Sequence, residues 1–228
     1  MKKTNKRFIA ALVVGLSLVA AACGSSDDAA EETPAAAGGE LEGMKGTMPL
    51  VALSDEFKTG MNEFWVAAGN AELTDFSYAA EAFDSVMLVA LAAEAAKTDG
   101  SALAGEIMNV SRDGETCTEF AACVELIKAG TDINFEGVSG PQDMNGNGEP
   151  IKASYGVLTF DATNRFDYAD AEYILADLPE SDYVDLQAPT VERAGDGVLK
   201  FGTLLPETGN LAFLGPPEFA GVEYAISL

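Results

Sequence analysis

The spacing of apolar residues predicts four helices between residues 54 and 129. The first begins after Ser54, a residue type that caps helix N-termini, and ends near Ala68. One side of it carries the apolar residues Phe57, Met61, Phe64, Trp65 and Ala68.

The second helix, over 78–96, is so rich in apolar residues that most of it must be buried. It contains Glu81, Asp84 and Glu94, which exclude a membrane span. Two shorter helices are predicted over 101–109 and 119–129. We expect Thr118 to cap the last of these and Gly130 to end it.

After Gly130 the pattern changes to that of strands. Strands are predicted over 133–140 and 154–161, with the loop "PQDMNGNGEP" between them, and "MPLVAL" at 48–53 is a further candidate. Near the end, a strand pattern over 198–205 is followed by a helix that begins at about Pro216. The chain is therefore expected to be α/β, with a helix-rich body and a small sheet.

Residues 1–22 have the composition of a secretory signal peptide. Four basic residues precede an apolar run that contains no acid, and the small residues at 20–22 precede Cys23. This arrangement predicts a bacterial lipoprotein signal, with Cys23 carrying the lipid. The alternative is an ordinary secretory peptide with an incidental cysteine, which Ala20 favours because lipoprotein signals usually have Leu at that position. The small, acidic residues of 23–40 indicate a flexible tether.

The charge of the chain excludes several classes of function. It has 37 acidic and 13 basic residues, a formal net charge of −24, and no histidine. Such a chain would be repelled by nucleic acids and by anionic membranes, so any membrane attachment must come from the lipid. Without histidine, the commonest general base and metal ligand are missing. We therefore expect no catalysis, no cofactor and no nucleic-acid partner.

Two further features have structural interpretations. Cys117 and Cys123 are predicted to form a disulfide that joins a loop to the first turn of the following helix. Residues 143–148 fit the first half of an EF-hand loop, but the twelfth position is Ser154 and the flanks are strands. A glycine-rich turn between two strands is the favoured interpretation, and no metal site is expected.

Longer stretches carry a resemblance to a family. "FSYAAEAFDSVMLVALAAEAA" and "CTEFAACVELIKAGTDINFEGVSGPQDMNGNGEPIKASYGVLTFD" resemble the C-terminal third of type I periplasmic binding proteins, in particular branched-chain amino-acid binding lipoproteins of ABC importers. The similarity extends from about 43 to 161, and its most specific part is the string Gly137–Gly140 with the turn and Ala153–Gly156 that follow. "LKFGTLLPETGNLAFLGPPEFAGVEYAISL" resembles the first strand and helix of the same family.

The resemblance implies an unusual order of parts. The signal peptide (1–22) and tether (23–40) would be followed by the C-terminal part of the family's domain (41–178), a linker (179–197) and a first β-α unit (198–228). We therefore expect a partial type I periplasmic-binding-protein fold with a detached terminal β-α unit. A truncated or rearranged coding region is favoured, and a circular permutant is the alternative.

The function implied by the resemblance is capture of an extracellular amino acid for a membrane permease. Phe213 or Leu214, just before Gly215, falls where relatives place an apolar residue against the ligand, although ordinary packing explains these residues equally well. Tyr78 and Asp84 are possible substitutes for lost ligand groups, but a structural role is favoured for both. Because most ligand-binding parts of the family are missing, the sequence predicts binding of leucine no tighter than about 1 mM. The alternative function is a lipoprotein remnant or scaffold that binds no ligand.

Overall fold

The computed structural model describes residues 39–178 and 193–228. The chain divides into two units, Met1–Gly38 and Gly39–Leu228. The helices and strands described below all belong to the second unit. The predicted signal peptide, Cys23, nearly all of the tether and residues 179–192 of the predicted linker lie outside the described residues.

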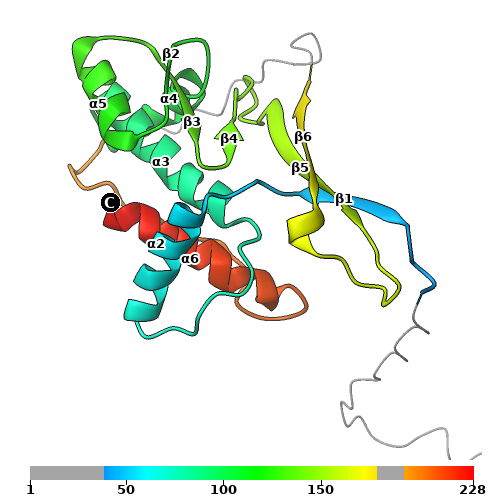
Figure 1. The fold of residues 1–228 in the computed structure, drawn as a ribbon. Coiled ribbons are helices and arrows are strands. Elements are labelled where there is room, and N and C mark those ends of the chain that lie inside the picture. Colours follow the sequence, from blue (N-terminus) through cyan, green and yellow to red (C-terminus); the bar gives the residue numbers. More distant parts are fainter. Residues whose placement is uncertain (1–38, 179–192) are drawn as a thin grey trace, which may run out of the picture. The chain divides into compact units, whose positions relative to one another are not determined.

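One sheet is antiparallel and has three strands in the order β1-β5-β6. These are β1 (Lys45–Pro49), β5 (Lys152–Thr159) and β6 (Glu172–Asp177) (Figure 1). β1 begins earlier than the predicted 48–53 because it pairs with β5, with Thr47 opposite Val157. It ends at Pro49, and one further backbone hydrogen bond to β5 follows, from the Leu50 amide to the Ser154 carbonyl oxygen at 3.2 Å. β6 was not predicted, and it forms by pairing along β5 from Val157 to Lys152.

The second sheet contains β2 (Glu115–Cys117), β3 (Ile133–Gly137) and β4 (Gly140–Pro141). β2 and β3 are parallel and are joined by helix α5 (Phe120–Ala129), which makes a β-α-β unit. The N-cap of α5 is Glu119, without a side-chain hydrogen bond, so the predicted Thr118 cap is wrong by one residue. Gly130 ends the helix as predicted, in the left-handed region with φ 80°.

Helix α3 (Ala79–Ala96) supplies the largest share of the core, and α2 (Asp55–Ala67) contributes to it. α2 begins as predicted, with the Ser54 hydroxyl accepting a hydrogen bond from the Phe57 amide at 3.1 Å. α3 is buried along much of its length, and α4 (Leu103–Asn109) packs against it. The most deeply buried apolar side chains come from α2, α3, α5 and β3, and they include Met61, Leu91, Cys123, Ile133 and Phe135.

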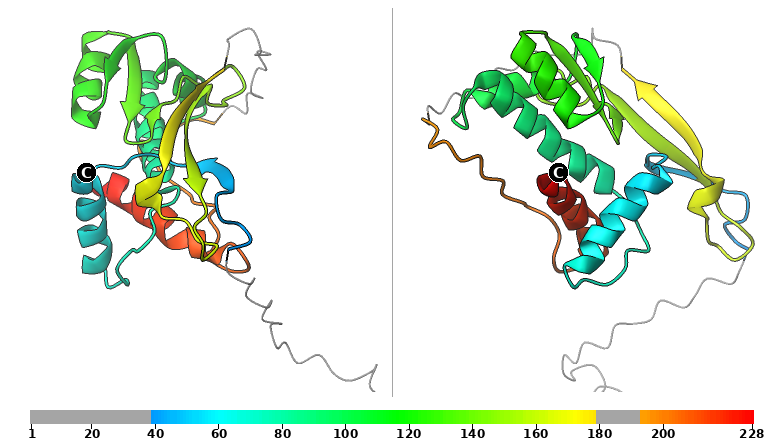
Figure 2. Two further views of the ribbon diagram at one scale, coloured as in Figure 1. Left: turned by 45° about the vertical axis from the view of Figure 1, so that its right-hand side comes forward. Right: turned by 60° about the vertical axis from the view of Figure 1, so that its left-hand side comes forward.

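The last helix, α6 (Gly215–Ser227), packs against α3 and α2 (Figure 2). Gly221 faces α3 so closely that a Cβ there would stand 2.2 Å from the Ala79 carbonyl oxygen. The ring of Tyr224 contacts those of Phe57 and Phe83, at centroid distances of 6.0 and 5.9 Å. α6 is therefore part of the folded body and is not a detached unit.

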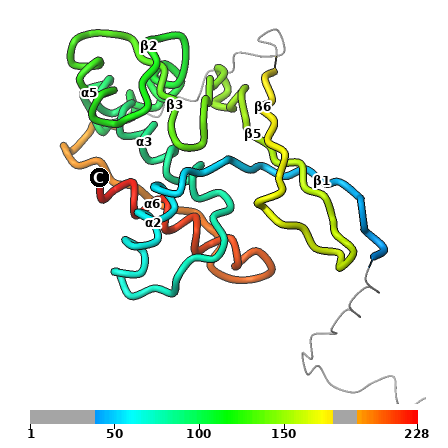
Figure 3. Tube along the Cα trace, viewed as in Figure 1, coloured from blue at the N-terminus to red at the C-terminus, as the bar shows by residue number. Residues whose placement is uncertain are grey.

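The predicted strand over 198–205 does not form. The chain between 193 and 211 contains no strand or helix, and its path can be followed in Figure 3. The Leu204 side chain is fully exposed. A strand needs a second strand to pair with its backbone groups, and no strand within residues 39–178 and 193–228 pairs with this segment. Hydrophobic alternation alone was therefore a misleading signal here.

Residues at the end of the predicted linker are attached to the loop between α3 and α4. The carboxylate of Asp99 accepts hydrogen bonds from the backbone amides of Asp196 and Gly197, each at 2.9 Å. The Ser101 amide donates to the Arg193 carbonyl oxygen at 2.9 Å. These bonds fix the start of the segment that leads to α6.

Candidate functional site

A cavity of about 390 Å³ lies at the N-terminus of α3. Its walls are the extended chain that follows β1, the loop before α3, the first turn of α3, and the region between Tyr168 and β6. Four aromatic residues line it: Phe76, Tyr78, Tyr168 and Tyr173. The volume is in the range of pockets that hold small molecules, which are about 300–1,000 Å³.

Three charged side chains line the same cavity, and two of them already have partners. The Lys58 ammonium lies 2.8 Å from a carboxylate oxygen of Asp55. The Asp75 carboxylate accepts hydrogen bonds from the Ser77 amide at 2.9 Å and the Ser77 hydroxyl at 2.7 Å. Glu81 has no ion-pair partner among the described residues. Burial raises the pKa of Glu81, because a desolvated carboxylate is less stable than the acid.

Tyr78 occupies an unusual backbone conformation at this site. It is the N-cap of α3 and has φ 62° and ψ 4°, in the left-handed region that bulky residues rarely adopt. Such a residue costs on the order of 1–3 kcal/mol and persists only where its surroundings hold it. Here the Ala79 amide donates to the Phe76 carbonyl at 3.1 Å and the Ala82 amide to the Tyr78 carbonyl at 3.0 Å. These two hydrogen bonds hold Tyr78, which lines the cavity, in its strained backbone conformation.

Asp84, which was considered together with Tyr78 as a substitute for a lost ligand-binding group, does not line the cavity. Its carboxylate is buried and accepts hydrogen bonds from the Val138 amide (3.1 Å), the Ser139 amide (2.6 Å) and the Ser139 hydroxyl (2.5 Å). A Cβ at Gly137 would collide with this carboxylate. Burial raises the pKa of Asp84 to about 6, although the hydrogen bonds from Ser139 and Val138 act in the opposite direction. Asp84 therefore holds the turn between β3 and β4.

The residues carried over from the family, Phe213, Leu214 and Gly215, do not line this cavity either. They lie at the start of α6, where Phe213 is 64% exposed. Gly215 is buried, and a Cβ there would stand 2.3 Å from the Pro206 carbonyl oxygen. Their contact with a ligand stays a prediction.

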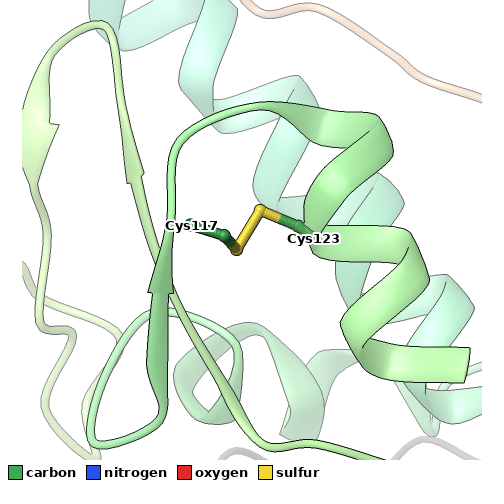
Figure 4. Close-up of a disulfide and its surroundings, with 2 residues drawn as sticks. All are labelled: Cys117 and Cys123. Carbon is green, nitrogen blue, oxygen red and sulfur yellow. A yellow bond between two sulfur atoms is a disulfide. The ribbon is translucent and has the colours of Figure 1, made fainter. Parts of the chain in front are cut away.

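The predicted disulfide between Cys117 and Cys123 is confirmed. It joins β2 to the first turns of α5, with 5.5 Å between the two Cα atoms (Figure 4). Both residues are buried. The bridge therefore fixes one strand of the β-α-β unit to its helix.

The EF-hand-like segment is a turn, as favoured from the sequence. The Asn145 side-chain oxygen accepts hydrogen bonds from the Asn147 amide at 2.9 Å and the Glu149 amide at 3.0 Å, which closes the loop on itself. Asp143 is paired with the Lys152 ammonium at 2.5 Å. Within residues 39–178 and 193–228, no three His, Cys, Asp or Glu side chains are grouped to hold a metal ion. In the same residues, no helix has both the length and the apolar character that crossing a membrane requires.

Comparison with known proteins identifies the family. Residues 26–163, more than half of the chain, match the receptor family ligand binding region. The chain belongs to this family of type I periplasmic-binding-protein-like domains. No curated protein and no solved structure matches the chain.

The family assignment agrees with the fold. A mixed α/β body with two small sheets is consistent with a partial type I periplasmic-binding-protein fold, as expected from the resemblance. The matched residues include most of the cavity lining, from Pro49 to Glu81, and end before Tyr168 and Tyr173. Sequence reasoning proposed Tyr78 but missed the rest of this lining. Only the pairing of β6 with β5 brings Tyr173 beside the start of α3.

Proposed function

We propose that this chain is the substrate-binding lipoprotein of an ABC importer, and that it captures an extracellular amino acid, branched-chain by its resemblance, for delivery to a permease. The chain would be extracytoplasmic and held at the cell membrane through a lipid on Cys23, and it would perform no catalysis. The observation that carries the proposal is the cavity at the start of α3, which lies largely within the segment matched by a ligand-binding family.

The cavity changes the expectation for affinity. The sequence predicts weak binding because it places no partner for the charged groups of an amino acid, and leaving such a group unpaired costs about 1–3 kcal/mol. The cavity supplies charged side chains and aromatic walls in one place. We therefore expect a dissociation constant below about 1 mM, which corresponds to about −4 kcal/mol.

A second candidate function is a lipoprotein remnant or scaffold that binds no ligand. The position of Phe213 and Leu214 favours it, because these residues lie outside the cavity although the family resemblance places one of them against the ligand. On this alternative the cavity would hold no ligand.

Uptake by cells separates the two functions. Cells that lack this chain should take up radiolabelled leucine more slowly than the parent strain. The full chain should restore uptake, and a copy with Tyr78→Ala should not, although it reaches the membrane in equal amount. If cells with and without the chain take up every tested amino acid at the same rate, the result would favour a remnant or scaffold that binds no ligand.

A further inference from the structure

We infer that Glu81 binds a positively charged amine of the ligand, and that this contact contributes more to affinity than any contact of a ligand carboxylate. The ligand class is therefore an amine with an apolar or aromatic body, which includes an amino acid whose ammonium contributes more to affinity than its carboxylate. This inference rests on the proposed function, since it concerns the same cavity.

The first argument is the state of the charged groups in the cavity lining. The Lys58 ammonium is engaged by Asp55, and the Asp75 carboxylate by the amide and hydroxyl of Ser77. Glu81 is the charged lining residue for which the described part of the chain offers neither a cation nor a donating side chain. A carboxylate without a cation partner in a partly buried site is stabilised by a cation that enters it.

The second argument is the charge of the surroundings. Asp84 lies one turn further along α3, and Glu218 lies on α6. Burial is the main cause that raises the pKa of both, and the negative charge of Glu81 raises it further. One carboxylate oxygen of Glu218 is buried without a hydrogen-bond partner among the described residues. Three carboxylates near one another create a negative potential at this side of the cavity. That potential attracts an ammonium group and repels a carboxylate.

The third argument is the aromatic lining. Phe76, Tyr78, Tyr168 and Tyr173 surround the same cavity, and Tyr78 is held there in a strained backbone conformation. The faces of aromatic rings attract cations, and more strongly where water is excluded. The rings also give an apolar body a surface to cover. A carboxylate is not attracted by the ring faces, although the tyrosine hydroxyls could donate hydrogen bonds to it.

Three probes that differ by one charged group test the inference. Leucine carries both groups, 3-methylbutylamine lacks the carboxylate, and 4-methylpentanoate lacks the ammonium. In calorimetric titrations of the purified protein, the amine should bind within about threefold of leucine, and the acid at least about tenfold more weakly than either. Equal or tighter binding of the acid would overturn the inference.

Substitutions assign the effect to Glu81. Glu81→Gln should weaken binding of 3-methylbutylamine at least about tenfold, Glu81→Asp should retain part of it, and the matched control Glu63→Gln, on the exposed part of α2, should leave it unchanged. Leucine binding that Glu81→Gln does not weaken would disprove the inference and leave the proposed function standing. Failure of the wild-type protein to bind any of the three probes would count against both. If Glu81→Gln does not fold, the relative affinities of the wild-type protein for the three probes are sufficient to test the inference.

Discussion

Asp84 and Ser139, 55 positions apart, are joined by two hydrogen bonds, since the Asp84 carboxylate accepts from both the backbone amide and the hydroxyl of Ser139. The bonds connect the middle of α3 to the turn between β3 and β4. This turn contains the most family-specific string of the sequence, from Gly137 to Gly140. The residues that carry the resemblance thus serve the packing of the domain, and Gly137 is required because a side chain there would displace the carboxylate.

The stability of the protein should depend on the protonation of Asp84. Burial raises the pKa of its carboxyl from 3.8 to about 6, so the folded state favours the protonated form. The folded protein is stabilised by the protonated form of Asp84. This stabilisation is fully present below pH 3.8 and is lost as the pH rises through 6. Between these limits Asp84 should lower the free energy of unfolding by about 3 kcal/mol.

Urea unfolding at pH 4 and pH 7 measures this effect. Asp84→Asn removes the titration and keeps the shape of the side chain, so the difference in stability between variant and wild type should change by about 2–2.5 kcal/mol between the two pH values. A constant difference would show that Asp84 titrates normally.

Gly221 should be essential for the docking of α6. A Cβ at this position meets the Ala79 carbonyl, which is backbone and cannot rotate away. We expect Gly221→Val to lower the free energy of unfolding by about 1–3 kcal/mol or more. Gly202→Val is the control, since a Cβ there has no neighbour within 4 Å. Equal melting temperatures of the two variants would mean that α6 does not pack on α3.

The disulfide should contribute to stability without being essential for folding. It closes a loop with a sequence separation of 6, so we expect reduction to cost about 2–3 kcal/mol at most. Mass spectrometry of the alkylated, non-reduced protein should find neither Cys117 nor Cys123 labelled. Labelling of both cysteines would contradict the bridge.

Cys23 should determine where the protein is found in the cell. We expect Cys23→Ser to release the protein from the envelope or to block its processing, because a strongly acidic chain is repelled by anionic lipids. Fractionation followed by immunoblotting gives the result. An unchanged membrane fraction of the variant would refute the lipid anchor.

Features set by local sequence could be predicted, and features set by distant pairing could not. The Ser54 cap, the end of α5 at Gly130 and the Cys117–Cys123 bridge each depend on residues close together in the chain. The 198–205 segment has the pattern of a strand, but none of the strands in the described part of the chain pairs with it. β6 was not predicted from the sequence, and it forms because β5 is its partner strand.

The candidate site was predictable only in part for the same reason. Tyr78 was identifiable as a candidate, yet its left-handed conformation is held by the loop before α3 and leaves no signal in the residue type. Tyr168 and Tyr173 join the cavity through the hairpin of β5 and β6. Nothing in their immediate sequence distinguishes them from surface tyrosines.

A calorimetric titration of the purified protein with leucine, isoleucine and valine tests the central claim most directly. We predict saturable binding of at least one of them with a dissociation constant below about 1 mM, weakened about tenfold or more by Tyr78→Ala. The absence of binding at concentrations about ten times higher, in protein that unfolds cooperatively, would show that the cavity is not a ligand site and that this chain is not a working receptor.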